Sequence, residues 1–150
     1  MKKNILLATT ILAFTYTASA DCDLKAKVEF SESRIFTPLK GSNATGGFAK
    51  IKNNCAEELE LVFKSADGFK AVESHVTVEE DGRMAMKKTD SFKIKPGETL
   101  ELAPGGKHLM FFDPQTEITE GSEVKLTFIF NKKELSVPFK VVSRIKELAP

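Results

Sequence analysis

Short segments of alternating apolar and polar residues, separated by turn-forming residues, run through the sequence from about residue 24 to residue 142. Because side chains two positions apart share one face of a strand, this alternation is typical of half-buried β-strands. Turn compositions such as SADG, EEDG, KPGE and APGG lie between the segments. We expect strands at 24–30, 46–54, 58–66, 71–79, 83–88, 98–103, 107–112, 123–130 and 135–142.

No segment after residue 20 carries a long apolar stripe with the 3.6-residue period of a helix. Regularly spaced strands without helices predict an all-β chain, built as an antiparallel sandwich or barrel. The longest irregular stretch, 33–45, is expected to cross between sheets.

Residues 1–20 have the pattern of a secretory signal peptide. Lys2 and Lys3 precede an apolar stretch, and small residues stand at Ala18 and Ala20, so we expect cleavage after Ala20. The apolar stretch is shorter than the roughly 20 residues that span a bilayer. The sequence therefore predicts a cleaved segment 1–20 and one exported, soluble domain, 21–150, without membrane insertion after cleavage. A lipid anchor at Cys22 is disfavoured, because an acidic residue precedes it where a small one is wanted.

The charge balance excludes some partners. The whole chain carries a formal net charge of +1, and loss of two signal lysines, with no acid, changes this to −1. Lysines and glutamates are interspersed, so no basic surface for nucleic acid or an anionic membrane is expected.

The chain has two cysteines, Cys22 and Cys55. An even number in an exported protein predicts a disulfide, which would tether the start of the mature chain to a turn after a strand. A reactive thiol pair stays open as the alternative, although neither cysteine lies in a CxxC pattern.

Both histidines and every methionine after the signal lie within 36 residues of one another: His75, Met84, Met86, His108 and Met110. A two-residue turn at Asp81-Gly82 would make His75 and Met86 diagonal neighbours on one face of a hairpin, a face shared by Met84. His108 and Met110, which are two positions apart in the segment 107–112, also share a face.

Imidazole and thioether together form a recognisable ligand set. Thioether sulfur is a soft, uncharged donor that suits Cu(I), whereas imidazole accepts either copper oxidation state. We therefore expect copper, with Cu(I) favoured and Cu(II) left open. The alternative is that these residues only fill space in a β-sandwich, since methionine is a common core residue.

The spacing H-x10-M-x21-H-x-M, with the run LAPGGKHLM and the segment SNATGGFAKIKNN, resembles the periplasmic copper-chaperone family of the PCuAC type over most of residues 28–142. The resemblance implies a cupredoxin-like, antiparallel Greek-key β-sandwich with one copper site. It also implies a periplasmic protein that buffers Cu(I) or delivers it toward a respiratory cytochrome oxidase, with an oxidase subunit or a second chaperone as the receiving partner. The metal ligands implied are His75, Met86, His108 and Met110, with an auxiliary role for Met84 open.

The chain departs from that family pattern in three places. Val76 stands where many relatives have methionine, and the C-terminal RIKELAP lacks the histidines and methionines of some relatives. The pair of cysteines is not part of the pattern either.

We expect no enzyme, because no nucleophile with a supporting base and no Gly-rich phosphate loop is recognisable. A redox cupredoxin would need a cysteine thiolate among its ligands, and the cluster has none. Two alternatives stay open: an exported structural or adhesive β-sandwich without metal, and a thiol or copper redox protein.

Overall fold

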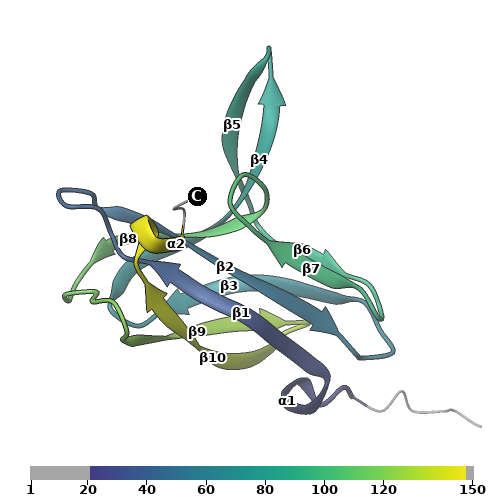
Figure 1. The fold of residues 1–150 in the computed structure, drawn as a ribbon. Coiled ribbons are helices and arrows are strands. Elements are labelled where there is room, and N and C mark those ends of the chain that lie inside the picture. The colour runs from purple at the N-terminus through teal and green to yellow at the C-terminus, as the bar shows by residue number, and fades with distance from the viewer. Residues whose placement is uncertain (1–20, 148–150) are drawn as a thin grey trace, which may run out of the picture.

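The computed structural model describes residues 21–147, so the predicted signal segment 1–20 lies outside the described residues. The described chain is mostly β-structure, with two one-turn helices (Figure 1). Its elements are α1 (Leu24–Lys27), β1 (Val28–Phe36), β2 (Ala44–Asn53), β3 (Leu59–Ala66), β4 (Phe69–Glu80), β5 (Arg83–Thr89), β6 (Phe92–Ile94), β7 (Thr99–Leu102), β8 (His108–Pro114), β9 (Glu123–Phe130), β10 (Lys133–Val142) and α2 (Arg144–Glu147). The all-β prediction is confirmed.

The first predicted strand is partly wrong. Residues 24–27 form the helical turn α1, and the strand begins at Val28. The side chain of Asp23 caps this turn by accepting a hydrogen bond from the backbone N–H of Lys25, at 3.1 Å. Such a cap offsets one of the unpaired N–H groups at a helix start, and it outweighs the weak alternation of LKAK.

The predicted irregular stretch 33–45 is also too long at both ends. β1 continues to Phe36 after a register shift between Ser31 and Arg34, and β2 already begins at Ala44. The short strand β6 was not predicted, because three residues carry too little alternation to be recognised.

The strands pair along one path, β5-β4-β8-β2-β1-β10-β9-β3-β6, and β7 pairs with β2. The pairing is antiparallel except between β1 and β10. The sheet folds back on itself, because Phe63 in β3 contacts Phe111 in β8 although these strands are far apart in this order; their ring centroids are 5.3 Å apart. The Greek-key arrangement stays a prediction.

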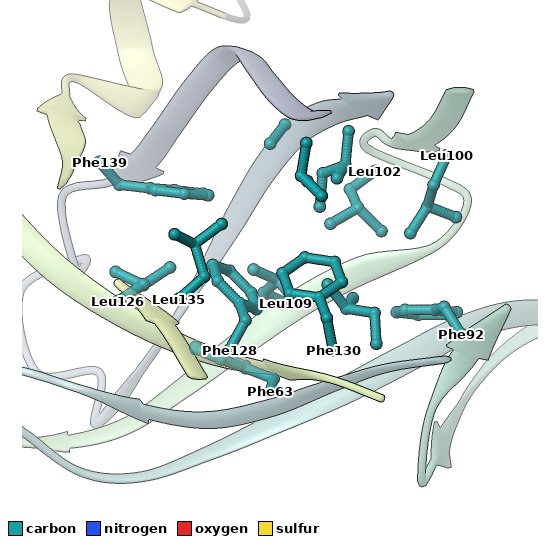
Figure 2. Packing of buried hydrophobic residues seen from close by; sticks show 14 of the residues in the cluster. Phe63, Phe92, Leu100, Leu102, Leu109, Leu126, Phe128, Phe130, Leu135 and Phe139 are labelled. Carbon is teal, nitrogen blue, oxygen red and sulfur yellow. The ribbon is translucent and has the colours of Figure 1, made fainter. Parts of the chain in front are cut away.

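The core fills the space that the curled sheet encloses (Figure 2). Phe128 lies near its centre, with ring centroids 5.3 Å from Phe63 and 6.0 Å from Phe139. Along β9 every second residue is buried, which is the alternation that the sequence carries: Val124, Leu126, Phe128 and Phe130. Among residues 21–147, no helix is long and apolar enough to cross a membrane.

Cys22 and Cys55 form a disulfide with a Cα–Cα distance of 5.9 Å. It joins the segment before α1 to the turn after β2. That turn is also held by the fully buried side chain of Asn53, which donates to the carbonyls of Glu57 and Ile94, each at 2.8 Å. The side-chain oxygen Oδ1 of Asn53 accepts from the backbone N–H of Cys55, also at 2.8 Å.

Candidate metal centre

The hairpin of β4 and β5 projects from the body of the molecule (Figure 1). Its two-residue turn, Asp81-Gly82, has positive φ at both positions, 52° and 74°. This is the backbone of the tight turns that favour Asp-Gly. The pairing follows as predicted, with Met86 opposite Thr77, so that Met86 is a diagonal neighbour of His75 on one face.

Strand β8 pairs with the other edge of β4 and brings the second half of the cluster to the same face. His75 lies directly opposite His108, and Glu73 lies directly opposite Met110. Side chains that oppose one another across two strands share a face. The ring centroids of His75 and His108 are 5.6 Å apart. The four residues singled out from the sequence thus lie on one face of β5, β4 and β8.

A groove of about 570 Å³ opens beside His108, and His75 does not line it. Met84, Met86, His108 and Met110 all contribute to its lining. Met84 and Met86 are 67% and 63% exposed, whereas His108 is 5% exposed. The thioethers on the hairpin are therefore reachable from solvent, whereas His108 is buried and the side chain of His75 is 14% exposed.

Each imidazole has one nitrogen held by a hydrogen bond and one nitrogen without a partner. Nδ1 of His108 donates to the carbonyl of Gly106 at 3.0 Å, and Nε2 of His75 lies 2.7 Å from Oε2 of Glu73. The other two atoms, Nδ1 of His75 and Nε2 of His108, are buried and have no hydrogen-bond partner among residues 21–147. A neutral imidazole that donates from one nitrogen has a lone pair on the other. Two lone pairs are therefore available for a ligand.

A backbone hydrogen bond holds the loop before β8 against β4. The carbonyl of Gly106 accepts from the backbone N–H of Thr77 at 3.1 Å, besides accepting from His108. One carbonyl thus fixes both the approach of the strand and the orientation of the ring.

Glu73 was not singled out from the sequence. Its Oε1 accepts from Nζ of Lys88 at 3.1 Å, while its Oε2 contacts His75. The hydrogen bond to His75, and then that to Lys88, hold the pKa of the Glu73 carboxyl below its usual value. The carboxylate is thus an ionised acceptor at neutral pH. A signal was available, since a residue two before a strand histidine must share its face.

The donor set fits a soft metal ion. In the described part of the chain, no three or more His, Cys, Asp or Glu side chains are grouped so that they could hold a metal. The groove that His108 lines is also lined by the thioethers of Met84, Met86 and Met110, which suit Cu(I) better than hard divalent cations. His75, Met86, His108 and Met110 could therefore hold one such ion.

Residues 22–141 match the family profile described as "Putative lipoprotein LpqE-like". "Putative lipoprotein Lxx21020" of Leifsonia xyli subsp. xyli is 30% identical over 147 residues, which are 95% of this chain and 89% of that protein. "Uncharacterized protein RP573" of Rickettsia prowazekii is 32% identical over 93 residues, which are 61% of this chain and 51% of that protein.

Two solved structures share the fold. The copper-bound PCuAC domain from PmoF2 matches with a TM-score of 0.65 and 21% identity, over 78% of this chain and 93% of that domain. The solution structure of CuI-DR1885 from Deinococcus radiodurans matches with a TM-score of 0.62 and 20% identity, over 75% of this chain and 76% of that one. At these identities the likeness shows the fold alone.

Proposed function

The chain belongs to the LpqE-like family of lipoproteins, and from its site we propose that it is a copper(I)-binding carrier. The observation that carries this proposal is the pair of buried, unpartnered nitrogens on His75 and His108. Leaving buried polar atoms without hydrogen bonds costs free energy, of the order of 1–3 kcal/mol each. A metal ion bound between them would recover that cost.

The proposed ligands are His75, Met86, His108 and Met110. All four are neutral donors, so they hold Cu(I) without adding negative charge, and they remain usable in an oxidising compartment where thiolates form disulfides. Met84 lines the same groove closer to solvent and has an auxiliary role, as a sulfur that copper meets on entering or leaving. Imidazole also accepts Cu(II), and binding of that ion remains a secondary expectation.

A carrier must release its cargo, and the open groove supports that requirement. The exposed thioethers of the hairpin give the ligands of a receiving protein direct access to the metal. Exchange of neutral ligands one at a time then moves copper from one protein to the other without a covalent step on this chain. The carrier is therefore not an enzyme in this proposal.

Further parts of the proposal concern setting and partner. The fold-sharing structures include a copper-bound and a CuI form, which supports copper as the cargo. The curled sheet, with its parallel β1–β10 pair, supports a cupredoxin-like Greek-key sandwich. We place the protein in the periplasm, where it buffers copper or passes it to the copper centre of a respiratory cytochrome oxidase or to a second chaperone.

The test is a competition for Cu(I) between the purified protein and a chromophoric chelator. The wild type is expected to retain one copper per chain. His108→Ala and Met110→Leu each remove one donor, and each is expected to weaken binding by roughly a hundredfold or more, which exceeds the loss typical of an outer-shell partner. Thermal unfolding of each variant checks that the fold persists.

The carrier proposal fails if the wild type does not retain copper at this ratio, or if both variants compete as well as the wild type. In that case the histidines and methionines are packing residues of a structural β-sandwich.

A further inference from the structure

Glu73 is the charged side chain that contacts the proposed ligand set without belonging to it. It lies on β4 two residues before His75, and its register partner on β8 is Met110. Its side chain is 29% exposed, so it is partly withdrawn from solvent. It therefore borders His75 and Met110 at one end of the donor set, on the same face of the sheet.

The two carboxylate oxygens of Glu73 have different partners. Oε2 lies 2.7 Å from Nε2 of His75, and Oε1 accepts from Nζ of Lys88 at 3.1 Å. Lys88 stands on β5, directly opposite His75 in the register. The carboxylate is thus held from the neighbouring strand, and it holds the imidazole in turn.

An ionised carboxylate only accepts hydrogen bonds, so the nitrogen facing Glu73 must carry the proton. In a neutral ring this leaves the lone pair of His75 on Nδ1, which is the buried atom without a partner. His108 has the opposite arrangement, because Nδ1 donates to the Gly106 carbonyl and Nε2 is left free.

We propose that Glu73 is a positioning residue that keeps the proton of His75 on Nε2 and thereby presents Nδ1 to the metal. The identity of the metal in this inference rests on the proposed function. Which nitrogen of His75 carries the proton does not depend on it. The site then binds copper through unlike nitrogens, Nδ1 of His75 and Nε2 of His108. Lys88 has a supporting role, since it fixes the carboxylate in the orientation that the ring requires.

A hydrogen bond from a ligand imidazole to a carboxylate orients the ring and raises its basicity, and loss of such a partner typically costs 10- to 100-fold in metal affinity. Glu73→Ala removes both acceptor oxygens, whereas Glu73→Gln keeps one oxygen, for which Nε2 of His75 and Nζ of Lys88 compete. The matched control is Glu134→Gln on β10. This glutamate forms an ion pair with Lys64 of β3, and neither strand pairs with β4, β5 or β8.

The first measurement is ¹⁵N NMR of the imidazoles in the copper-free protein at fixed neutral pH. We expect the wild type and the control to have His75 protonated on Nε2 and His108 on Nδ1. In Glu73→Ala, the His75 shifts should move to the averaged values of a free imidazole, while those of His108 stay unchanged. If Glu73 only stabilised the fold, its loss would not change the shifts of His75 while leaving those of His108 unchanged. His75 keeping its Nε2 proton in Glu73→Ala overturns the inference.

The second measurement is Cu(I) competition on the same variants. The expected order of affinity is wild type and control, then Glu73→Gln, then Glu73→Ala, with the last weaker than wild type by about 10- to 100-fold. An unchanged affinity in Glu73→Ala contradicts the positioning role at the metal. If the wild type itself retains no copper, the carrier proposal fails, while the NMR result still decides whether Glu73 fixes the ring.

Discussion

Among the described residues, Asn53 and the two histidines show two different states of a buried polar atom. Asn53 is fully buried and its amide satisfies three backbone groups, so it adds stability to the turn after β2. His108 is buried and His75 is partly buried, and each has one buried nitrogen without a partner among the described residues. A buried polar atom without a hydrogen bond is rare in folded proteins and needs a reason. Binding of a metal ion supplies that reason at the histidines.

Asn53→Leu should lower the free energy of unfolding by about 2–3 kcal/mol, because it leaves the carbonyl of Ile94 and the N–H of Cys55 without this hydrogen-bond partner in the interior. Urea unfolding of the disulfide-intact protein measures this loss.

The neighbouring Asn54→Leu is the matched control. Its amide donates to Glu29 at the surface, so the change should stay within about 0.5 kcal/mol. Equal losses in both variants would mean that the buried hydrogen bonds of Asn53 contribute nothing beyond those at the surface.

At the scale of elements, local features could be predicted and long-range pairings could not. The β4–β5 hairpin followed from Asp81-Gly82, since a two-residue turn determines the register on both sides. The pairing of β4 with β8 joins segments more than thirty residues apart, and no local signal fixes which residues oppose each other. The contact between His75 and His108 is therefore new information from the structure. Glu73 was missed for a different reason, because its role depends on its hydrogen bonds.

The disulfide should stabilise the fold without affecting metal binding. Gly46, which pairs with Met110, is seven residues from Asn53 along β2, so about 23 Å of strand separate the site from the turn at Cys55. Replacing Cys22 and Cys55 together by serine should cost about 2–4 kcal/mol of stability and leave Cu(I) affinity unchanged. Denaturant unfolding and copper competition on one preparation measure both quantities.

If copper affinity falls together with stability in the double serine variant, the cysteines take part in the chemistry. The thiol or copper redox alternative would then replace the structural role of the disulfide.

At the scale of the whole molecule, the sheet curls so that Phe63 and Phe111 meet across the core, and this buries the inner face of β8. Leu109 and Phe111 hold the strand from inside, while His108 and Met110 face the groove on its other side. The alternation of one seven-residue strand thus serves both the core and the site. The sequence pattern predicted this division within the strand, but the curl depends on packing among distant aromatic residues.

The central claim is that one copper ion binds where β5, β4 and β8 meet. Crystals loaded with Cu(I) and measured on both sides of the copper absorption edge test it most directly. The expected result is a single anomalous peak, within bonding distance of Nδ1 of His75, Nε2 of His108 and the sulfurs of Met86 and Met110. Copper bound elsewhere on the chain, or no ordered copper between these strands, would contradict the claim.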